Sequence, residues 1–115
     1  MSIKTSTRQS GSVTVVDVSG QIKLGEGSSL LRDTVKELLG KGHKKILLNL
    51  GDVNYIDSTG IGELVSAYAS VRNQGGEMKL LRVTKKVRDV LQIMRLYTVF
   101  HVLDDESAAI AAFNS

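Results

Sequence analysis

The chain has 115 residues, of which 42% are apolar and 23% are charged, and its formal net charge is +3. This length fits one domain, residues 1–115, and the composition is typical of a folded protein that buries a core. The chain has no cysteine, which excludes disulfide frameworks, thiol catalysis and cysteine-based zinc or iron–sulfur sites.

The same numbers limit the partners and the location. A charge of +3 is mild and does not require nucleic acid as a partner. The first residues are polar, which argues against a signal peptide. No apolar stretch approaches the roughly 18 residues that span a bilayer. We therefore expect a cytoplasmic protein without membrane insertion, and nothing in the sequence requires more than a monomer.

The N-terminal part of the chain predicts a β-hairpin. Residues 3–8 alternate in polarity and residues 13–19 are rich in β-branched side chains, with a turn pattern at 9–12 between them. The two segments therefore predict two antiparallel strands at one end of a sheet. Residues 20–27 contain three glycines and predict a loop.

The next segments predict a helix and a central strand. Apolar residues over 28–39 recur at helical spacing. Residues 45–50 are nearly all apolar, which is typical of a strand covered on both faces. The helix has two serines as candidate N-caps and two glycines as candidate ends: Ser28, Ser29, Gly40 and Gly42.

The C-terminal half continues the alternation of helices and strands. Residues 58–74 predict a helix that a glycine pair ends, and 77–83 and 99–103 predict strands. Thr84 and Asp104 are expected to cap the two remaining helices. The expected buried faces of these two helices are Val87, Val90, Leu91 and Met94 in the first, and Ala109, Ile110 and Phe113 in the second.

The element order predicts an α/β fold. Strands joined through helices run parallel with right-handed connections. The expected architecture is a small open mixed β-sheet of about five strands, with an N-terminal antiparallel hairpin and mostly parallel strands after it, packed with about four helices.

Most enzyme motifs fail on inspection. The segment 25–30 lacks the third glycine of a dinucleotide loop and the ending of a Walker loop. Ser58 is not in a nucleophile elbow, because Ile56 replaces the first glycine. His43 and His101 are far apart in sequence and lack evident catalytic partners. We expect no catalytic residues, no metal site and no cofactor, and therefore no enzyme.

Basic residues gather late in the chain. A basic helix face is most often simply solvated, and without interleaved aromatic residues it gives little support for nucleic-acid stacking. The residues concerned are Lys79, Arg82, Lys85, Lys86, Arg88 and Arg95.

The segment 52–62 carries the strongest functional pattern. It follows the most apolar strand and opens a helix, and sites in open α/β sheets lie at the carboxyl ends of strands. Gly60 and Gly62 fall in the first helical turn, where each costs up to about 0.8–1 kcal/mol relative to alanine. Such a cost predicts close backbone approach, either from the sheet or from a partner.

Two hydroxyl residues, Ser58 and Thr59, lie at the same helix start. Ordinary helix capping is sufficient to explain them. A helix N-terminus also favours an anion, and a phosphate on Ser58 would add about −1.5 to −2 charge without disrupting the fold. Such a modification would change a surface and leave the scaffold intact.

The run Asp57-Ser58-Thr59-Gly60-Ile61-Gly62 resembles the Asp-Ser-(Ser/Thr)-Gly-(Leu/Ile)-Gly motif of STAS domains, specifically of bacterial anti-sigma-factor antagonists. The resemblance covers nearly the whole chain. It includes the strand at 13–20, the central strand at 46–50 with Val53 and Ile56, and the glycine pair before the next strand. It implies a STAS-like fold.

The resemblance also implies a partner switch. The unphosphorylated protein would bind an anti-sigma factor, itself a serine kinase, and release a sigma factor. The kinase would phosphorylate Ser58, with Thr59 as the second choice, and a serine phosphatase would reset the protein. The implied contact surface is the motif together with Lys23 and Gly25 of the glycine-rich loop. Many family members have an acidic residue in this loop, whereas Lys23 reverses the charge.

Two other hypotheses remain open. The chain is then either a STAS interaction module of another assembly, such as a stress-signalling scaffold or a lipid-transport complex, or a module that binds a small ligand or nucleotide. The second would use the helix N-termini and the loop at 25–27.

Overall fold

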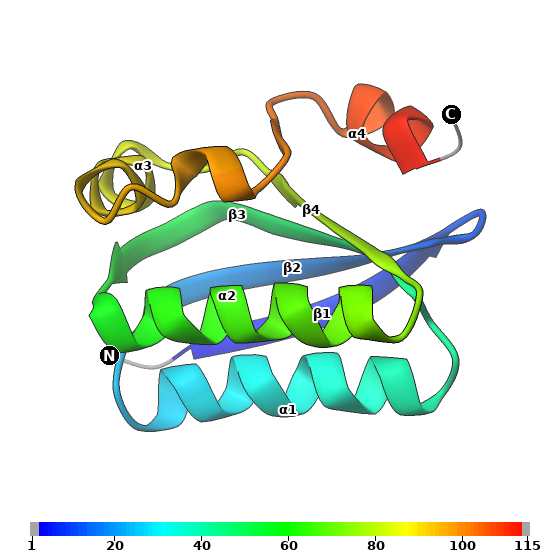
Figure 1. Ribbon diagram of the computed structural model, residues 1–115, viewed down its shortest axis with the longest axis horizontal. Coiled ribbons are helices and arrows are strands. Elements are labelled where there is room, and N and C mark those ends of the chain that lie inside the picture. The colour runs from blue at the N-terminus through cyan, green and yellow to red at the C-terminus, as the bar shows by residue number, and fades with distance from the viewer. Residues whose placement is uncertain (1–2, 114–115) are drawn as a thin grey trace.

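The computed structural model describes residues 3–113. The elements follow the predicted order of strands and helices, with one added 3-10 turn (Figure 1). They are β1 (Ile3–Ser10), β2 (Val13–Ile22), α1 (Glu26–Gly40), β3 (Lys45–Ile56), α2 (Ser58–Asn73), β4 (Glu77–Leu81), α3 (Lys85–Ile93), the 3-10 turn (Tyr97–Val99), β5 (Val102–Leu103) and α4 (Glu106–Phe113).

The five strands form one mixed sheet in the order β1-β2-β3-β4-β5. β1 pairs antiparallel with β2, and all later neighbours are parallel. This confirms the predicted hairpin and parallel remainder. β3 lies in the middle, and Ile46, Leu47 and Leu48 at its start are fully buried, as a strand covered on both faces requires.

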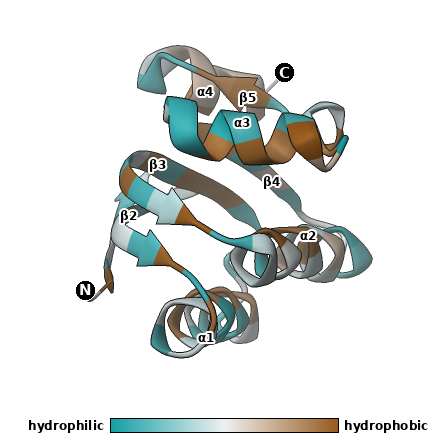
Figure 2. Cartoon of the chain, turned by 90° about the vertical axis from the view of Figure 1, so that its left-hand side faces the viewer, coloured by the Kyte–Doolittle hydropathy of each residue, from teal (hydrophilic) through white to brown (hydrophobic). Residues whose placement is uncertain are grey.

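Helices cover both faces of the sheet. α1 and α2 lie side by side along one face, α4 packs on the opposite face, and α3 lies over the end of β3 (Figures 1 and 2). Alternate residues of β2 and β3 face the two layers. On the α1–α2 face the core includes Val16, Val18, Leu31, Val35, Leu48, Ile61 and Leu64. On the α4 face it consists of Val13, Val15, Leu47, Leu81, Ala109 and Phe113.

Both central strands extend further than the sequence pattern predicts. β2 continues through Ile22 into the expected loop, and β3 continues to Ile56. Their extensions pair with each other, Gly20 with Val53 after one register shift and Ile22 with Ile56 after a second. Val53 and Ile56 are almost fully buried. The stabilisation from burying these two side chains therefore outweighs the low strand propensity of the glycine and polar residues in the two extensions.

Two helix starts also differ from the prediction. α1 begins at Glu26 with Gly25 as its N-cap, whose φ of 103° favours glycine. Ser28 therefore lies inside the helix, where its Oγ donates to the carbonyl of Gly25 at 3.2 Å. α4 is capped by Asp105 instead of Asp104, because Asp105 Oδ2 accepts from Ala108 N at 2.9 Å.

The C-terminal third differs in three more details. The strand expected at 99–103 is reduced to Val102–Leu103, because the preceding residues form the 3-10 turn. β4 ends at Leu81, before Arg82 enters a positive φ of 55°. Thr84 caps α3 as predicted, but Met94 is 38% exposed and lies beyond the buried face of that helix.

An ionic cluster ties α4 to the sheet. Arg8 on β1 donates to Asp17 on β2 at 2.7 Å and to Glu106 on α4 at 2.7 Å. Asn49 on β3 donates to the same Asp17 carboxylate at 2.8 Å. We call these four residues the Arg8 cluster. It joins four elements through side chains alone.

Within residues 3–113, none of the helices combines the length and apolar character needed to cross a membrane.

Candidate functional site

The predicted motif lies where β3 ends and α2 begins. Asp57 is the N-cap of α2, with extended backbone, and its Oδ1 accepts from Gly60 N at 2.8 Å. This bond satisfies one of the free N–H groups at the helix start. The capping residue is thus Asp57, and the hydroxyls of Ser58 and Thr59 are not needed for that purpose.

Asp57 also holds the neighbouring loop. Its Oδ2 accepts from Leu24 N at 3.1 Å, and its own N–H donates to the carbonyl of Ile22 at 3.3 Å. Desolvation by itself would raise the pKa of Asp57, but N–H donors from Gly60, Leu24 and Thr59 outweigh it and hold that pKa below its ordinary value. The carboxylate is therefore ionised and fixes the β2–α1 loop against the start of α2.

The inner side of the first turn is closely packed. Gly60 is buried, and a Cβ at this position would overlap the carbonyl oxygen of Ile22 and lie 2.8 Å from Ile56 Cγ1. Ile61 is fully buried in the core. Gly60 and Ile61 therefore support the site from inside the fold, and they do not extend the contact surface as the motif led us to expect.

The outer side of the same turn is open. Ser58 is exposed, and within residues 3–113 its side chain has no hydrogen-bond or ionic partner. Thr59 is half-buried. Gly62 is exposed, and a Cβ there would meet nothing within 4 Å. The two glycines of the motif therefore differ. Packing against β2 and β3 requires a glycine at position 60, whereas the fold leaves space for a side chain at position 62.

The β2–α1 loop places Lys23 and Gly25 at this end of the molecule. Ser28 N donates to the carbonyl of Lys23 at 3.0 Å, and Ser29 N donates to that of Gly25 at 3.1 Å. Between them Leu24 is 74% exposed although Asp57 holds its backbone. Sequence reasoning missed Leu24. Its signal is a lone apolar residue inside a loop of polar and glycine residues.

The start of α3 flanks the site and was also missed. Thr84 Oγ1 donates to the carbonyl of Val53 at 3.0 Å, which joins the start of α3 to the end of β3. Lys86 of α3 lies over the ring of Tyr55, with Nζ 5.4 Å from its centroid. Figure 2 views this end directly, with α3 above the ends of β2 and β3, α1 below them and α2 to their right.

Other candidate residues lie away from this end. His101 is exposed beside β4, with Nδ1 at 3.1 Å from Lys79 Nζ. Lys79 is only 9% exposed and packs over Phe113, so it is not part of a solvated basic face. His43 lies in the turn before β3. Residues 3–113 contain no group of His, Cys, Asp or Glu side chains that could hold a metal ion.

The geometry at the start of α2 is suited to recognition. It presents one exposed hydroxyl, one fixed carboxylate and one exposed leucine on a rigid frame made of three element ends. A general base is not among the hydrogen-bond partners of the Asp57 carboxylate, which are backbone N–H groups.

Comparison with known proteins agrees with this description. The model of the STAS domain family matches residues 4–109. A TM1081 homolog from Thermotoga neapolitana is 39% identical over 74 residues, which is 64% of this chain and 66% of the relative, just under two thirds of its length. The anti-sigma-B factor antagonist of Bacillus subtilis is 28% identical over 102 residues, which is 89% of this chain and 92% of the relative.

Solved structures share the fold. The crystal structure of TM1081 from Thermotoga maritima superimposes with a TM-score of 0.88 at 28% identity, covering 96% of this chain and 95% of that one. The phosphorylated form of the Bacillus cell fate determinant SpoIIAA has a TM-score of 0.73 at 18% identity, covering 95% and 98%. Because the family model covers nearly all of the sheet and its helices, this chain belongs to the STAS domain family.

Proposed function

We propose that this chain is an anti-sigma-factor antagonist that works by partner switching. In this proposal its unphosphorylated form binds an anti-sigma factor with serine kinase activity and so frees a sigma factor. Phosphorylation of Ser58 ends that binding, and a serine phosphatase restores it. The chain acts as one non-enzymatic domain, and the relative named anti-sigma-B factor antagonist, which aligns with 89% of it, supports this assignment.

The observation that carries the proposal is the free hydroxyl of Ser58 at the exposed start of α2. Asp57 supplies the cap and the loop anchor, so the fold does not depend on the Ser58 side chain. Modification of Ser58 therefore changes the surface and leaves the scaffold unchanged. Thr59 is half-buried and is the less accessible acceptor of the two.

A phosphate on Ser58 would act locally. It adds about −1.5 to −2 charge next to the ionised carboxylate of Asp57 and beside the exposed Leu24. A partner that covers Leu24 would desolvate both negative groups. An unpaired charge buried at an interface costs several kcal/mol, and about 4 kcal/mol corresponds to roughly a thousandfold weaker binding.

The first test is phosphorylation by the cognate anti-sigma-factor kinase with ATP. We expect intact-mass spectrometry to detect one added phosphate on the unchanged chain and on Thr59→Val, and none on Ser58→Ala. Phosphate on the Ser58→Ala chain would reject the assigned site.

The second test measures binding to the same anti-sigma factor by calorimetry. We expect Ser58→Ala to bind as the unmodified chain does, and Ser58→Asp or the phosphorylated chain to bind at least a hundredfold more weakly. Glu26→Gln provides a charge change on an exposed residue of the neighbouring helix start. Equal binding of the phosphorylated and unmodified chains would exclude the switch and would favour a constitutive interaction module.

A further inference from the structure

The exposed large apolar side chains are unevenly distributed over the surface. Leu24 and Ile93 are the most exposed of them, at 74% and 79%. Single exposed apolar residues are normal on a protein surface, whereas a group of them around one site indicates a contact surface. Within residues 3–113 the exposed large apolar residues are Leu24, Tyr55, Ile93, Met94 and Val99.

The geometry of α3 places Ile93 on the same helix face as Lys86. The two residues are seven positions apart, which is two helical turns, so their side chains project from one face about 10 Å apart. Val87 and Leu91 form the buried face of this helix instead. Lys86 Nζ lies 5.4 Å from the ring centroid of Tyr55. The face of α3 that carries Ile93 is therefore turned toward the end of β3.

The segment 55–57 connects this face of α3 to the β2–α1 loop. Tyr55 contacts Lys86 of α3 at one end of the segment, and Asp57 accepts from Leu24 N at 3.1 Å at the other. Ser58 follows directly. Figure 2, which faces this end of the molecule, shows α3 lengthwise across it and the link from β2 to α1 below. Leu24 and the Lys86 face of α3 thus lie at the same end of the molecule as Ser58.

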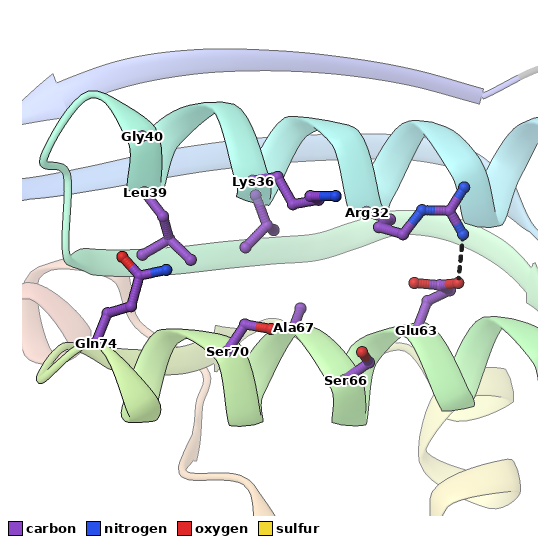
Figure 3. A pocket seen from close by; sticks show the side chains of 10 residues that line it. Arg32, Lys36, Leu39, Gly40, Glu63, Ser66, Ala67, Ser70 and Gln74 are labelled. Atoms are coloured by element: carbon purple, nitrogen blue, oxygen red, sulfur yellow. Dashed lines mark hydrogen bonds and ion pairs between the residues drawn. The ribbon is translucent and has the colours of Figure 1, made fainter.

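The groove between α1 and α2 shows the contrast. Its apolar lining residues Val35, Leu39 and Ala67 are 1%, 6% and 6% exposed, so the chain itself already covers them. Arg32 donates to Glu63 across one end of this groove at 3.1 Å (Figure 3). The groove therefore offers a protein partner little apolar area, whereas the end of the molecule at the start of α2 offers two uncovered aliphatic side chains.

One lysine accompanies each of these two aliphatic residues. Lys23 precedes Leu24 in the loop, and Lys86 shares the helix face of Ile93. Among the described residues, neither lysine has a carboxylate within ion-pair distance. Protein interfaces typically combine an apolar centre with a polar rim, and opposite charges across the rim speed association. The surface therefore fits a protein that presents an apolar patch bordered by carboxylates.

We propose that the anti-sigma factor of the partner switch contacts both the β2–α1 loop and α3, with Leu24 and Ile93 as its two apolar anchors. Burying large aliphatic side chains that are uncovered in the free chain favours association. Ser58 then lies within the covered area, where a phosphate is desolvated on binding. The inference rests on the proposed function, because it names the surface that the same partner covers.

The experiment measures binding of the purified anti-sigma factor to the unphosphorylated chain by calorimetry. We expect Leu24→Ser and Ile93→Ser each to weaken binding about 10-fold to 100-fold, the value of a large aliphatic side chain lost from a contact. Both side chains are exposed in the free chain, so the melting temperature should be maintained.

Val99→Ser is the matched control. Val99 is also exposed, at 38%, but it lines a recess beside β4 that contains no residue of the motif, so its variant should bind as the unchanged chain does. Unchanged binding of Ile93→Ser would overturn the contact with α3. An equal loss in Val99→Ser would overturn the assignment of the surface.

The charges are tested through the association rate. At low salt, Lys23→Gln and Lys86→Gln should slow association severalfold, and the difference should disappear at about 1 M salt. Lys36→Gln, which removes the same charge from the groove between α1 and α2, should leave the rate unchanged. Equal slowing by all three variants would contradict a carboxylate rim on the partner.

This inference and the proposed switch fail in different ways. If phosphorylation of Ser58 prevents binding but Ile93→Ser does not weaken it, the switch is retained and the contact with α3 is wrong. If Ile93→Ser weakens binding but phosphorylation does not, the surface is retained and the switch is wrong. Sedimentation of the chain alone tests a second copy as the occupant, and a dimer that Ile93→Ser dissociates would overturn the assignment to the anti-sigma factor.

Discussion

The start of α2 and the Arg8 cluster both hold a carboxylate in its ionised form, but by different means. At Asp57 the donors are backbone N–H groups of Gly60 and Leu24, and no charged partner takes part. At Asp17 the donors are side chains, first Arg8 and then Asn49, and these hydrogen bonds hold the pKa of Asp17 below its ordinary value. The pKa of Glu106 is also lowered, mainly by its hydrogen bond from Arg8.

This difference has consequences for tolerance and for function. Backbone donors fix the site geometry without placing a cation at the surface, so an added phosphate has no neutralising partner supplied by the cap. They also leave little room for adjustment, because a backbone N–H group cannot move as a flexible side chain does. The Arg8 cluster is partly exposed, and its ion pairs should be screened by salt. We therefore expect the start of α2 to tolerate substitution poorly and the Arg8 cluster to tolerate it better.

The largest expected effect is at Gly60. Gly60→Ala places a Cβ against the carbonyl of Ile22, and overpacking of this kind costs about 1–3 kcal/mol or more. We expect a loss of about 3 kcal/mol in the free energy of unfolding, measured with urea. Gly62→Ala is the matched control, which should gain up to about 0.5–1 kcal/mol from helix propensity. Equal stability of the two variants would show that the fold does not distinguish the inner Gly60 from the outer Gly62.

The next effect is at Asp57 itself. Asp57→Ala removes the helix cap and the anchor of Leu24, which together should cost about 2 kcal/mol. Amide hydrogen exchange of Leu24 and Gly60 should rise in the same variant. Ser58→Ala should change the free energy of unfolding by less than about 0.5 kcal/mol. A large loss in Ser58→Ala would mean that the hydroxyl is structural.

A smaller effect is expected in the other region. Arg8→Gln should cost about 1 kcal/mol, because the ion pairs are partly exposed, with Arg8 at 44% side-chain exposure. The loss should shrink in about 1 M salt, where the Debye length is about 3 Å. Lys85→Gln, which breaks the exposed Lys85–Asp89 pair at 2.8 Å, should cost only about 0.3–0.5 kcal/mol. If Arg8→Gln lost the same free energy of unfolding at low and high salt, the proposed difference between the Arg8 cluster and Asp57 would be wrong.

The smallest effect is on how steeply the stability of the fold falls at acid pH. The folded-state pKa values of Asp17, Asp57 and Glu106 are all lowered, so these groups stabilise the fold above the unfolded pKa of about 4. That stabilisation is lost as the pH falls through the folded-state values. Asp57→Asn should reduce this dependence of stability on pH equally at low and high salt. Arg8→Gln should reduce it mainly at low salt. Thermal unfolding between about pH 2 and pH 5 measures both slopes.

The sequence by itself determined the element order, the antiparallel hairpin and the position of the motif. These follow from local signals: the β-branched run at 13–19, the apolar run at 45–50 and the helical spacing of apolar residues in the segments between strands. Thr84 illustrates this, because its capping role depends only on the turn that follows it. Such features depend on neighbours within a few residues, and the pattern in the chain records them.

Only the tertiary structure decided what depends on distant neighbours. The extension of β3 to Ile56 depends on pairing with the end of β2, which the polar residues between 51 and 55 conceal in the sequence. The roles of Gly60 and Gly62 separate only when Ile22 is brought against the first turn of α2. Leu24 joins the site through a hydrogen bond across 33 residues. Local patterns do not encode which backbone lies opposite, and packing of the sheet against its helices supplies that information.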